Sequence, residues 1–314
     1  MPKDSKGISQ AVPPVVGIDA VAIVGLGLMG GSLGLALKRY CPGVTVVGYA
    51  RREETRKLAL AMGACDVVTD DLAQAVQDAD VVVLCTPILE IAALVERVRE
   101  ALRPGAIVTD VGSTKAMLME QVGALLGDQT ACFIGSHPMA GSERTGMQSA
   151  DADLYVDAVV IVTPPDGNAC LPQSEVVQGL WRAVGARVLV VGAAEHDAVV
   201  AGTSHVPHLV AALLVRAAAR TAVAPGPYCG PGFRDATRIA SGSEWVWHDI
   251  VKSNAGSIAV SLQAVRDDIE MLLAALDRHD YDQIRDVLGS ARELRANIIA
   301  QPVDAGGGDS SWNK

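Results

Sequence analysis

The chain has 314 residues, half of them hydrophobic, which is enough for two domains that each bury a core. Its 26 Lys and Arg residues are outnumbered by 36 Asp and Glu residues. The resulting net charge of −10 excludes nucleic acid as the expected partner, because a phosphate backbone would be repelled. The six cysteines show no CxxC or zinc-type spacing, so we expect reduced, mostly buried thiols.

Residues 1–17 contain no apolar stretch of the roughly 7 to 15 residues that a secretory signal needs, and we expect a flexible N-terminus. The apolar stretch from Val206 to Ala219 is interrupted by Pro207, His208 and Arg216, which leaves it short of the ~18 residues of a membrane span. We therefore expect a soluble, cytoplasmic protein with no membrane partner.

From Ala20 onwards, short β-branched runs alternate with Ala- and Leu-rich amphipathic stretches, which is the pattern of a parallel sheet covered by helices. Strands buried on both faces are apolar throughout, so uninterrupted apolar runs predict the strands. These are Ala20 to Val24, Thr45 to Tyr49, Val81 to Cys85, Ile107 to Asp110, Cys132 to Ser136, Ala158 to Thr163 and Arg187 to Val191. Helices are predicted between them, for example Met29 to Tyr40 and Thr55 to Met62. We assign this α/β domain to residues 18–192.

After Val191 the strand signal stops, and helical periodicity continues to about Ile299. We predict an all-helical second domain over residues 193–300, with long helices from Ala255 to Leu276 and from Tyr281 to Ile298. Such apolar helices commonly bury their stripe against another copy of the chain, so we expect a homodimer. Residues 301–314 are glycine-rich without an apolar period, and we expect a disordered tail.

The motif GLGLMG directly follows the first predicted strand and opens the next helix. Its first glycine allows a tight turn, the second lets the backbone approach a pyrophosphate, and the third permits close helix packing. The helix N-terminus adds N–H donors. The alternative is a glycine turn that binds nothing, but the strand, turn and helix context favours a Rossmann-like dinucleotide-binding domain. Its predicted cofactor-binding residues are Gly25, Leu26, Gly27, Leu28, Met29 and Gly30, with Thr86 and Pro87 after a neighbouring strand.

The second strand is followed by Ala50, Arg51 and Arg52, where an NAD-binding domain usually carries an acidic residue. Without that carboxylate a 2′-phosphate is not repelled, and the two arginines are able to pair with it. The alternative is a pair of solvated arginines neutralised by Glu53 and Glu54. The cofactor is therefore predicted as NAD(P), with NADP slightly favoured.

Two polar segments follow predicted strands at the sheet edge where open α/β folds bind ligands. They are DVGSTK at residues 110–115, which contains Ser113, and SHPMAGSE at residues 136–143, which contains His137. Alone, Ser113 reads as a helix cap and His137 as a structural ring. The backbone restraint of Pro138 and Gly141 favours a functional loop instead.

The helical domain adds the polar segments SHVPH at residues 204–208 and GFRDATRIA at residues 232–240, followed by a Trp-rich stretch. His205 and His208 are spaced to share a helical face, but no third ligand accompanies them, so no metal site is predicted. Arg234 and Arg238 taken alone read as surface charges.

These segments, in this order, resemble the prephenate and arogenate dehydrogenase family over about Asp19 to Ile299. The motifs are GLGLMGGS, DVGSTK, SHPMAGSE, SHVPH and GFRDATRIA with a following tryptophan. The resemblance implies a Rossmann-like domain followed by a helical dimerisation domain, and an NAD(P)-dependent oxidative decarboxylation in tyrosine biosynthesis. Prephenate and arogenate stay open, as do NAD and NADP. The chain ends before the regulatory ACT domain that many members carry, so that form of feedback is not expected.

The resemblance also implies roles for individual residues. His137 resembles the histidine that accepts a hydrogen bond from the ring C4 hydroxyl of the substrate, and Ser113 its partner on that hydroxyl. Arg238 resembles the arginine that binds a substrate carboxylate. The other substrate-contacting positions implied are Ser142, Glu143, Ser204, His208 and Trp247.

Two alternatives remain. A β-hydroxyacid dehydrogenase shares the glycine loop and a helical domain, but it needs a helical Lys four residues before an Asn, whereas Lys252 and Asn254 have the wrong spacing. A non-catalytic NADP sensor would have no need for Ser113, His137 and Arg238 together.

Overall fold

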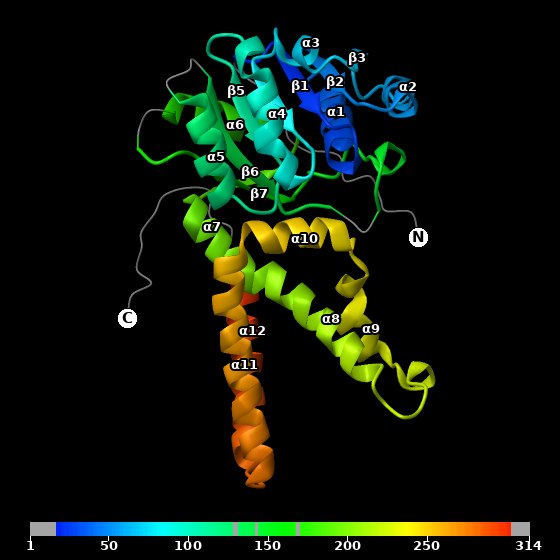
Figure 1. Cartoon of the computed structure of the whole chain (residues 1–314), viewed down its shortest axis with the longest axis vertical. Coiled ribbons are helices and arrows are strands. Elements are labelled where there is room, and N and C mark those ends of the chain that lie inside the picture. The colour runs from blue at the N-terminus through cyan, green and yellow to red at the C-terminus, as the bar shows by residue number, and fades with distance from the viewer. Residues whose placement is uncertain (1–16, 128–130, 142–143, 168–169, 303–314) are drawn as a thin grey trace. The chain divides into compact units, whose positions relative to one another are not determined.

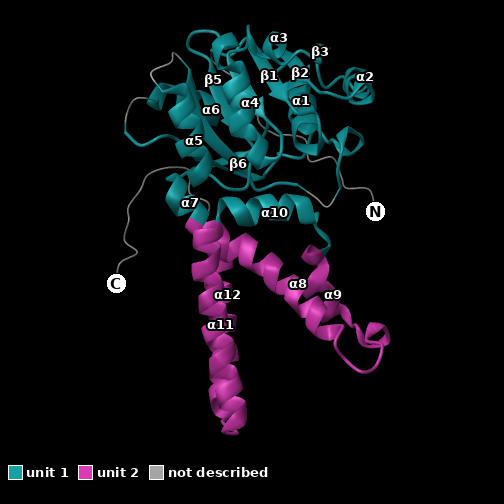
Figure 2. Ribbon diagram, viewed as in Figure 1, with its two compact units in different colours: residues 1–197, 241–254, 305–314 teal, residues 198–240, 255–304 magenta. Residues whose placement is uncertain are grey.

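The computed structural model describes residues 17–127, 131–141, 144–167 and 170–302 (Figure 1). The expected flexible N-terminus and disordered tail fall almost wholly outside these residues. The chain divides into two compact units, shown in Figure 2. The first comprises residues 1–197, 241–254 and 305–314, and the second comprises residues 198–240 and 255–304.

The first unit contains one eight-stranded sheet, with the strand order β3-β2-β1-β4-β5-β6-β7-β8. Each predicted strand is present, which confirms the α/β fold. The bounds are β1 Ala20–Val24, β2 Thr45–Tyr49, β3 Val67–Thr69, β4 Val81–Leu84, β5 Ile107–Asp110, β6 Cys132–Pro138, β7 Val159–Thr163 and β8 Arg187–Val190.

The sheet differs from the expected parallel one because β7 pairs antiparallel with β6. The connection between them contains only the short 3-10 helix Met147–Ser149 among its described residues, and no crossover α-helix. A parallel pairing requires such a crossover, so β7 runs back along β6 instead. The three-residue edge strand β3 is an addition that the apolar runs did not predict.

Helices cover both faces of the sheet, and side chains of the strands belong to two separate hydrophobic cores. In β1, Val21 and Ile23 belong to one core and Ala22 and Val24 to the other, which explains why the whole strand is apolar. The first core is completed by α1 Leu28–Tyr40, α2 Glu53–Ala61 and α6 Leu171–Ala183. The second is completed by α3 Leu72–Val76, α4 Ile91–Val98 and α5 Ala116–Leu126.

Two further helices contribute residues to the first unit. Helix α7, Ala193–Val200, begins in this unit, and the whole of α10, Glu244–Ser253, belongs to it. The side chain of Thr114 donates a 2.8 Å hydrogen bond to the hydroxyl of Ser253 at the end of α10. The first unit thus includes residues 193–197 and 241–254, which the sequence analysis assigned to the helical domain. The predicted domain boundary between residues 192 and 193 stays a prediction.

The second unit is helical. It contains a π-helical turn at Ala201–His205, α8 Val206–Ala218, α9 Pro231–Thr237, α11 Ala255–Asp277 and α12 Tyr281–Ala300. Of the side chains in α11, only those of Ile258 and Ala275 are buried, and α12 has none.

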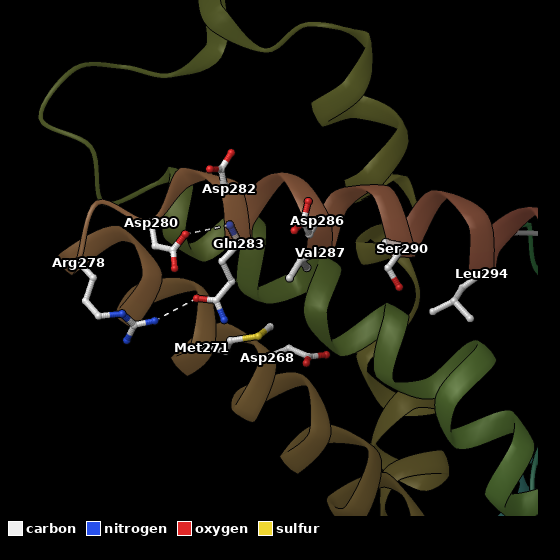
Figure 3. Close-up of a pocket in the computed structure, with 11 residues that line it drawn as sticks. Asp268, Met271, Arg278, Asp280, Asp282, Gln283, Asp286, Val287, Ser290 and Leu294 are labelled. Carbon is white, nitrogen blue, oxygen red and sulfur yellow. Dashed lines mark hydrogen bonds between the residues drawn. The ribbon is translucent and has the colours of Figure 1, made fainter. Parts of the chain in front are cut away.

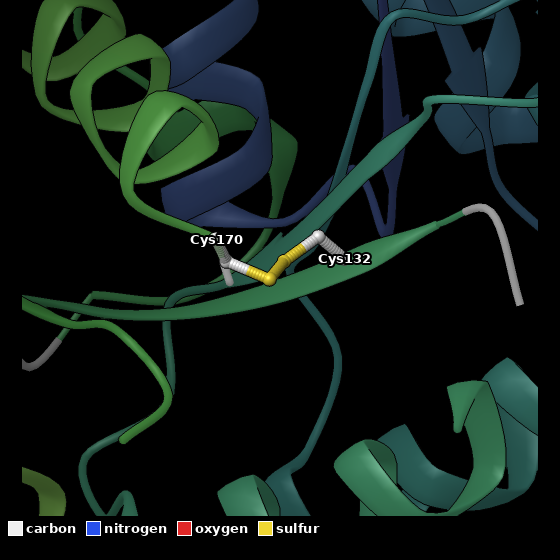
Figure 4. Close-up of a disulfide and its surroundings, with 2 residues drawn as sticks. All are labelled: Cys132 and Cys170. Atoms are coloured by element: carbon white, nitrogen blue, oxygen red, sulfur yellow. A yellow bond between two sulfur atoms is a disulfide. The ribbon is translucent and has the colours of Figure 1, made fainter. Parts of the chain in front are cut away.

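Cys132 and Cys170 form a disulfide, which corrects the expectation that all six cysteines are reduced (Figure 4). Cys132 begins β6 and Cys170 precedes α6, with 6.5 Å between their Cα atoms. The two residues are 38 positions apart, so no local spacing in the sequence reveals the pairing. The other cysteines are free thiols, and burial raises the pKa of Cys65 to about 12.

The helical run Ala193–Ala218 bears on the expected absence of a membrane span. Its most apolar window has a mean hydropathy of 1.6, so by length and composition alone it is able to cross a membrane. A single helix of this kind is weak evidence, because core helices of soluble proteins pass the same test. The run also carries His196 and His205, both buried.

Candidate active site

The glycine loop between β1 and α1 has the geometry that its sequence predicts. Gly25 has a φ of +103°, and a Cβ there would lie 2.6 Å from the carbonyl oxygen of Cys85. A Cβ on Gly30 would lie 2.0 Å from the carbonyl oxygen of Gly25. In contrast, a Cβ on Gly27 would meet no atom within 4 Å, which leaves open space where a pyrophosphate would approach.

A cavity of about 640 Å³ lies at this loop, within the size range of small-molecule sites. Of the predicted cofactor residues, Gly25, Leu26, Gly27, Ala50, Arg51, Arg52, Thr86 and Pro87 line it. Leu28, Met29 and Gly30 do not. The Oγ1 atom of Thr86 is buried and has no hydrogen-bond partner within the described part of the chain. This hydroxyl and the open space at Gly27 fit a nicotinamide dinucleotide.

At the end of this cavity after β2, the backbone is fixed while two arginine side chains are exposed. The Nη1 atom of Arg56 donates hydrogen bonds to the carbonyl oxygens of Ala50 and Arg51, at 2.8 and 2.9 Å. Glu53 pairs with Lys57, not with Arg51 or Arg52. Neither arginine has an ion pair to another described residue, so both positive charges are available for an anionic ligand.

A second cavity of about 450 Å³ adjoins the first and shares four wall residues with it, Cys85, Thr86, Pro87 and Glu90. Ser113 lines this second cavity, as does Met29. From α10 the wall receives Trp245 and Val246, whereas the predicted Trp247 is not among the lining residues. The second cavity therefore lies where a substrate would sit beside the cofactor.

Ser113 lies in a turn that a buried carboxylate holds in place. The two carboxylate oxygens of Asp110 accept hydrogen bonds from the backbone N–H groups of Ser136 (3.0 Å) and Gly112 (2.7 Å). The ammonium group of Lys115 also donates to Asp110, and both side chains are fully buried. Burial lowers the pKa of Lys115, and the charge of Asp110 opposes that shift. This pair fixes the end of β5 against β6.

His137 lies on β6 and is buried. Its Nδ1 atom is 2.8 Å from Nε2 of His196, whose Nδ1 is in turn 2.7 Å from a carboxylate oxygen of Asp197. The neighbouring Ser136 is held by hydrogen bonds with Thr109 and Trp181. The strand thereby presents His137 in a rigid setting.

Sequence reasoning missed His196 and Asp197. The segment EHD at residues 195–197 lies at the start of the predicted helical domain, and His196 is 59 residues away from His137. An adjacent His and Asp shortly after a predicted strand was the available signal, but only the fold brings them to His137.

The remaining predicted residues divide between the units. Ser204, His208 and Arg238 lie in the second unit, and Trp247 in the first. Arg238 is exposed, whereas His208 is buried and burial lowers its pKa. Ser142 and Glu143 lie outside the described residues. In the described ranges, no group of three or more His, Cys, Asp and Glu side chains is arranged to hold a metal ion.

A third cavity, of about 830 Å³, lies in the second unit and is lined by α11, α12 and the turn between them (Figure 3). Four carboxylates surround it, those of Asp268, Asp280, Asp282 and Asp286. Among the described residues of this wall, Arg278 is the one basic residue, and it donates a 3.0 Å hydrogen bond to Gln283. Such a wall repels carboxylate ligands, and none of the predicted site residues that the structure describes lines it.

Comparisons with known proteins agree with this geometry. Residues 33–190 match the family model described as prephenate dehydrogenase, nucleotide-binding domain, and residues 192–290 match prephenate dehydrogenase, dimerization domain. A cyclohexadienyl dehydrogenase from Zymomonas mobilis is 34% identical over 281 residues, which cover 88% of this chain and 94% of that protein.

Two solved structures are also similar. Prephenate dehydrogenase from A. aeolicus in complex with hydroxyphenyl propionate and NAD+ has a TM-score of 0.82, with 29% identity over 89% of this chain and 98% of that one. Synechocystis arogenate dehydrogenase has a TM-score of 0.78, with 29% identity over 89% of this chain and 99% of that one. The protein therefore belongs to the prephenate dehydrogenase family and is a nicotinamide-dependent oxidoreductase.

Proposed function

We propose that this protein oxidatively decarboxylates prephenate or arogenate with NAD(P)+ as the hydride acceptor, in tyrosine biosynthesis. The observation that carries the proposal is the shared wall between the two cavities, with Ser113 in the smaller one. A ring acid there lies next to the cofactor site, as hydride transfer requires. His137 lies one residue beyond Ser136, which Asp110 ties to the turn of Ser113.

The chemistry assigns a task to each group. A hydride leaves ring C4 and CO2 leaves C1. The proton of the C4 hydroxyl passes to a base while carbonyl character develops at C4, and it returns to the oxygen as the ring becomes aromatic, so that a phenol product forms. The bound nicotinamide supplies the hydride acceptor. His137 accepts the hydroxyl proton at Nε2, because its Nδ1 is hydrogen-bonded to His196. General-base assistance of this kind contributes ~10² to 10⁴-fold in rate. Ser113 orients the same hydroxyl.

We assign substrate binding to the further residues that the resemblance implies. Arg238 clamps a carboxylate through its guanidinium fork, which fixes the ring face that the cofactor meets. Burial lowers the pKa of His208, so that this residue contacts the substrate as a neutral imidazole. The other proposed contacts are Ser142, Glu143, Ser204 and Trp247.

We further propose that NADP is the preferred cofactor, with Arg51 and Arg52 pairing to the 2′-phosphate. Arg51→Ala is expected to weaken NADP binding about tenfold or more while leaving NAD binding nearly unchanged, because only NADP carries that phosphate. Lys57→Ala, which removes an equal charge from the following helix, is the matched control and should alter neither affinity. Equal losses for both cofactors in Arg51→Ala would contradict this role.

We also propose a cytoplasmic homodimer, formed through the helical unit, with no nucleic acid or membrane partner. Support comes from the match to a dimerization domain, from the exposed apolar side chains of α11 and α12, and from the net charge of −10.

The decisive experiment measures the absorbance of reduced nicotinamide with purified protein, for each pairing of prephenate or arogenate with NAD+ or NADP+. Turnover in one pairing identifies substrate and cofactor together. His137→Ala is expected to reduce kcat at least ~100-fold with cofactor affinity retained. Cofactor binding without turnover of either acid would overturn the proposal and favour a non-catalytic sensor.

A further inference from the structure

Behind His137 runs a chain of buried polar side chains that the proposed reaction does not itself require. His137, His196 and Asp197 are 7%, 1% and 2% exposed, and consecutive members are hydrogen-bonded at 2.8 and 2.7 Å. The rings of His137 and His196 meet edge to face, with 5.1 Å between centroids.

The far end of this chain is fixed at the N-terminus of α5. One carboxylate oxygen of Asp197 accepts a 2.7 Å hydrogen bond from the backbone N–H of Lys115, and the other accepts a 2.9 Å bond from that of Ala116. The side-chain amide of Asn254 donates to the carbonyl oxygen of Asp197 at 2.8 Å. The positive end of the helix dipole and the N–H donors stabilise the ionised carboxylate.

These contacts determine where the protons lie. An ionised Asp197 has no proton to give, so Nδ1 of His196 must be the donor in that contact. A neutral His196 then has no proton on Nε2, which must accept from Nδ1 of His137. In a neutral His137, the proton on Nδ1 leaves Nε2 with a lone pair, which is the form that accepts a proton from a hydroxyl.

We propose that His196 and Asp197 are positioning residues for the dehydrogenase reaction. They hold His137 in the tautomer with the proton on Nδ1, and they stabilise the imidazolium that forms when Nε2 takes the hydroxyl proton. No bond to either residue forms or breaks: the Nδ1–H of His137 stays directed at His196, whose own Nδ1–H stays directed at the carboxylate. The inference rests on the proposed function, because it assigns these residues to the base of that reaction.

Two substitutions of His196 separate its two tasks. His196→Leu removes the acceptor for Nδ1 of His137, and it is expected to lower kcat about 10- to 100-fold with cofactor affinity and substrate KM within about twofold of wild type. His196→Gln offers an amide oxygen in place of Nε2, and it should recover part of kcat. Ser174→Ala is the matched control, since it removes a buried hydroxyl whose partner within the described part of the chain is the side-chain amide of Gln178.

The pH profile distinguishes positioning from a merely structural contact. In His196→Gln the tautomer of His137 is kept, but the ionised carboxylate no longer acts through a second imidazole. The acid limb of kcat/KM should therefore move to lower pH, because protonation of His137 has lost its stabilisation. An acid limb that stays in place in His196→Gln would overturn the charge-stabilising half of the proposal.

A spectroscopic measurement tests the tautomer without any turnover. Long-range ¹⁵N–¹H correlation spectra of the ¹⁵N-histidine-labelled full-length protein report which ring nitrogen carries the proton, and loss of one signal set in His137→Asn assigns that residue. The wild type and Ser174→Ala should show the proton of His137 on Nδ1, and His196→Leu should not. A proton on Nε2 in the wild type, or an unchanged pattern in His196→Leu, overturns the inference.

These readouts also separate the two proposals. If neither acid is turned over, the proposed function fails, while the spectra still decide whether His196 sets the tautomer. If His196→Leu does not fold, as judged by circular dichroism and cofactor binding, the wild-type spectra and the pH profile of His196→Gln decide the inference.

Discussion

The two units of this protein bury their apolar side chains to very different extents. In the first, Trp181, Tyr155 and Leu180 have no accessible surface and belong to a core cluster on the sheet. In the second, α12 buries no residue and exposes Leu288 at 65%. The first unit therefore completes its own core, whereas the second carries exposed apolar surface, which is the kind of surface that marks interaction sites.

The units also differ in where they keep their charges. The first buries the Asp110 and Lys115 pair and the carboxylate of Asp197, each held by several hydrogen bonds. In the second, the ion pair between Arg285 and Asp282 is exposed on both sides. Buried charges require fixed partners, while exposed ion pairs contribute little to stability. Substitution of a buried charged residue of the first unit should therefore change the free energy of unfolding strongly, and substitution of an exposed charged residue of the second unit should change it little.

The largest effect on stability is expected from Trp181→Ala. Removing this fully buried ring leaves a cavity beside Tyr155 and deprives Ser136 of a hydrogen bond, which should lower the free energy of unfolding by about 3–5 kcal/mol. Urea unfolding measures the loss, and Trp245→Ala, where the ring is 75% exposed, is the matched control. Similar losses in the two variants would show that the first unit is not the self-contained core described above.

The next effect concerns association. Leu288→Glu places a charge on the exposed apolar surface of α12, and it should weaken self-association at least about tenfold, or ~1.4 kcal/mol. Sedimentation at several protein concentrations measures this. Val67→Glu makes the same change at an exposed apolar residue of the first unit and should leave association unaltered. A monomeric wild type would contradict the expected contrast between the units.

A smaller, pH-dependent effect is expected at Asp66. Burial alone raises the pKa of its carboxyl, but hydrogen bonds from Lys38 and from the backbone of Val46 outweigh burial, and the pKa lies below its ordinary value of 3.8. A lowered carboxyl pKa stabilises the fold above the unfolded value, and this stabilisation is lost as the pH falls through the folded one. Because the pair is partly exposed, Asp66→Asn should cost no more than about 1 kcal/mol at neutral pH. Urea unfolding should show this difference shrinking below pH 3.8; a difference that persists there would exclude the carboxylate as its source.

The smallest effect is expected for Arg285→Ala in α12. Its exposed contacts to Asp282 and Asp286 lie in high-dielectric surroundings, so the free energy of unfolding should change by no more than about 0.5 kcal/mol. Thermal unfolding at low and high salt measures it. A larger, salt-sensitive loss would mean that the charges of the second unit matter more than their exposure indicates.

The fold was predictable from the sequence wherever local pattern and burial coincide. The bounds of β1, β2 and β5 are the predicted ones, because strands buried on both faces form continuous apolar runs. The antiparallel direction of β7 was not predictable, since periodicity records which faces are buried and not which way a strand runs. The edge strand β3 is too short to give a pattern.

The site shows the same division. The glycine loop and Ser113 lie against cavities because local motifs after strands determine their positions. The contact of His137 with His196 and the Cys132–Cys170 disulfide depend on residues 59 and 38 positions apart, and a single sequence does not encode such distances in any local spacing. Even Trp245 and Trp247, two residues apart, could be told apart only by the cavity that Trp245 lines.

The wall common to the two cavities predicts that their ligands bind interdependently. Cys85, Thr86, Pro87 and Glu90 border both spaces, so a molecule that orders these residues from one side prepares the surface that the other molecule contacts. If the bound dinucleotide changes the affinity for the acid by some factor, the bound acid must change the affinity for the dinucleotide by the same factor. Four residues between the end of β4 and the 3-10 helix Ile88–Glu90 are thus expected to couple the binding of the two ligands.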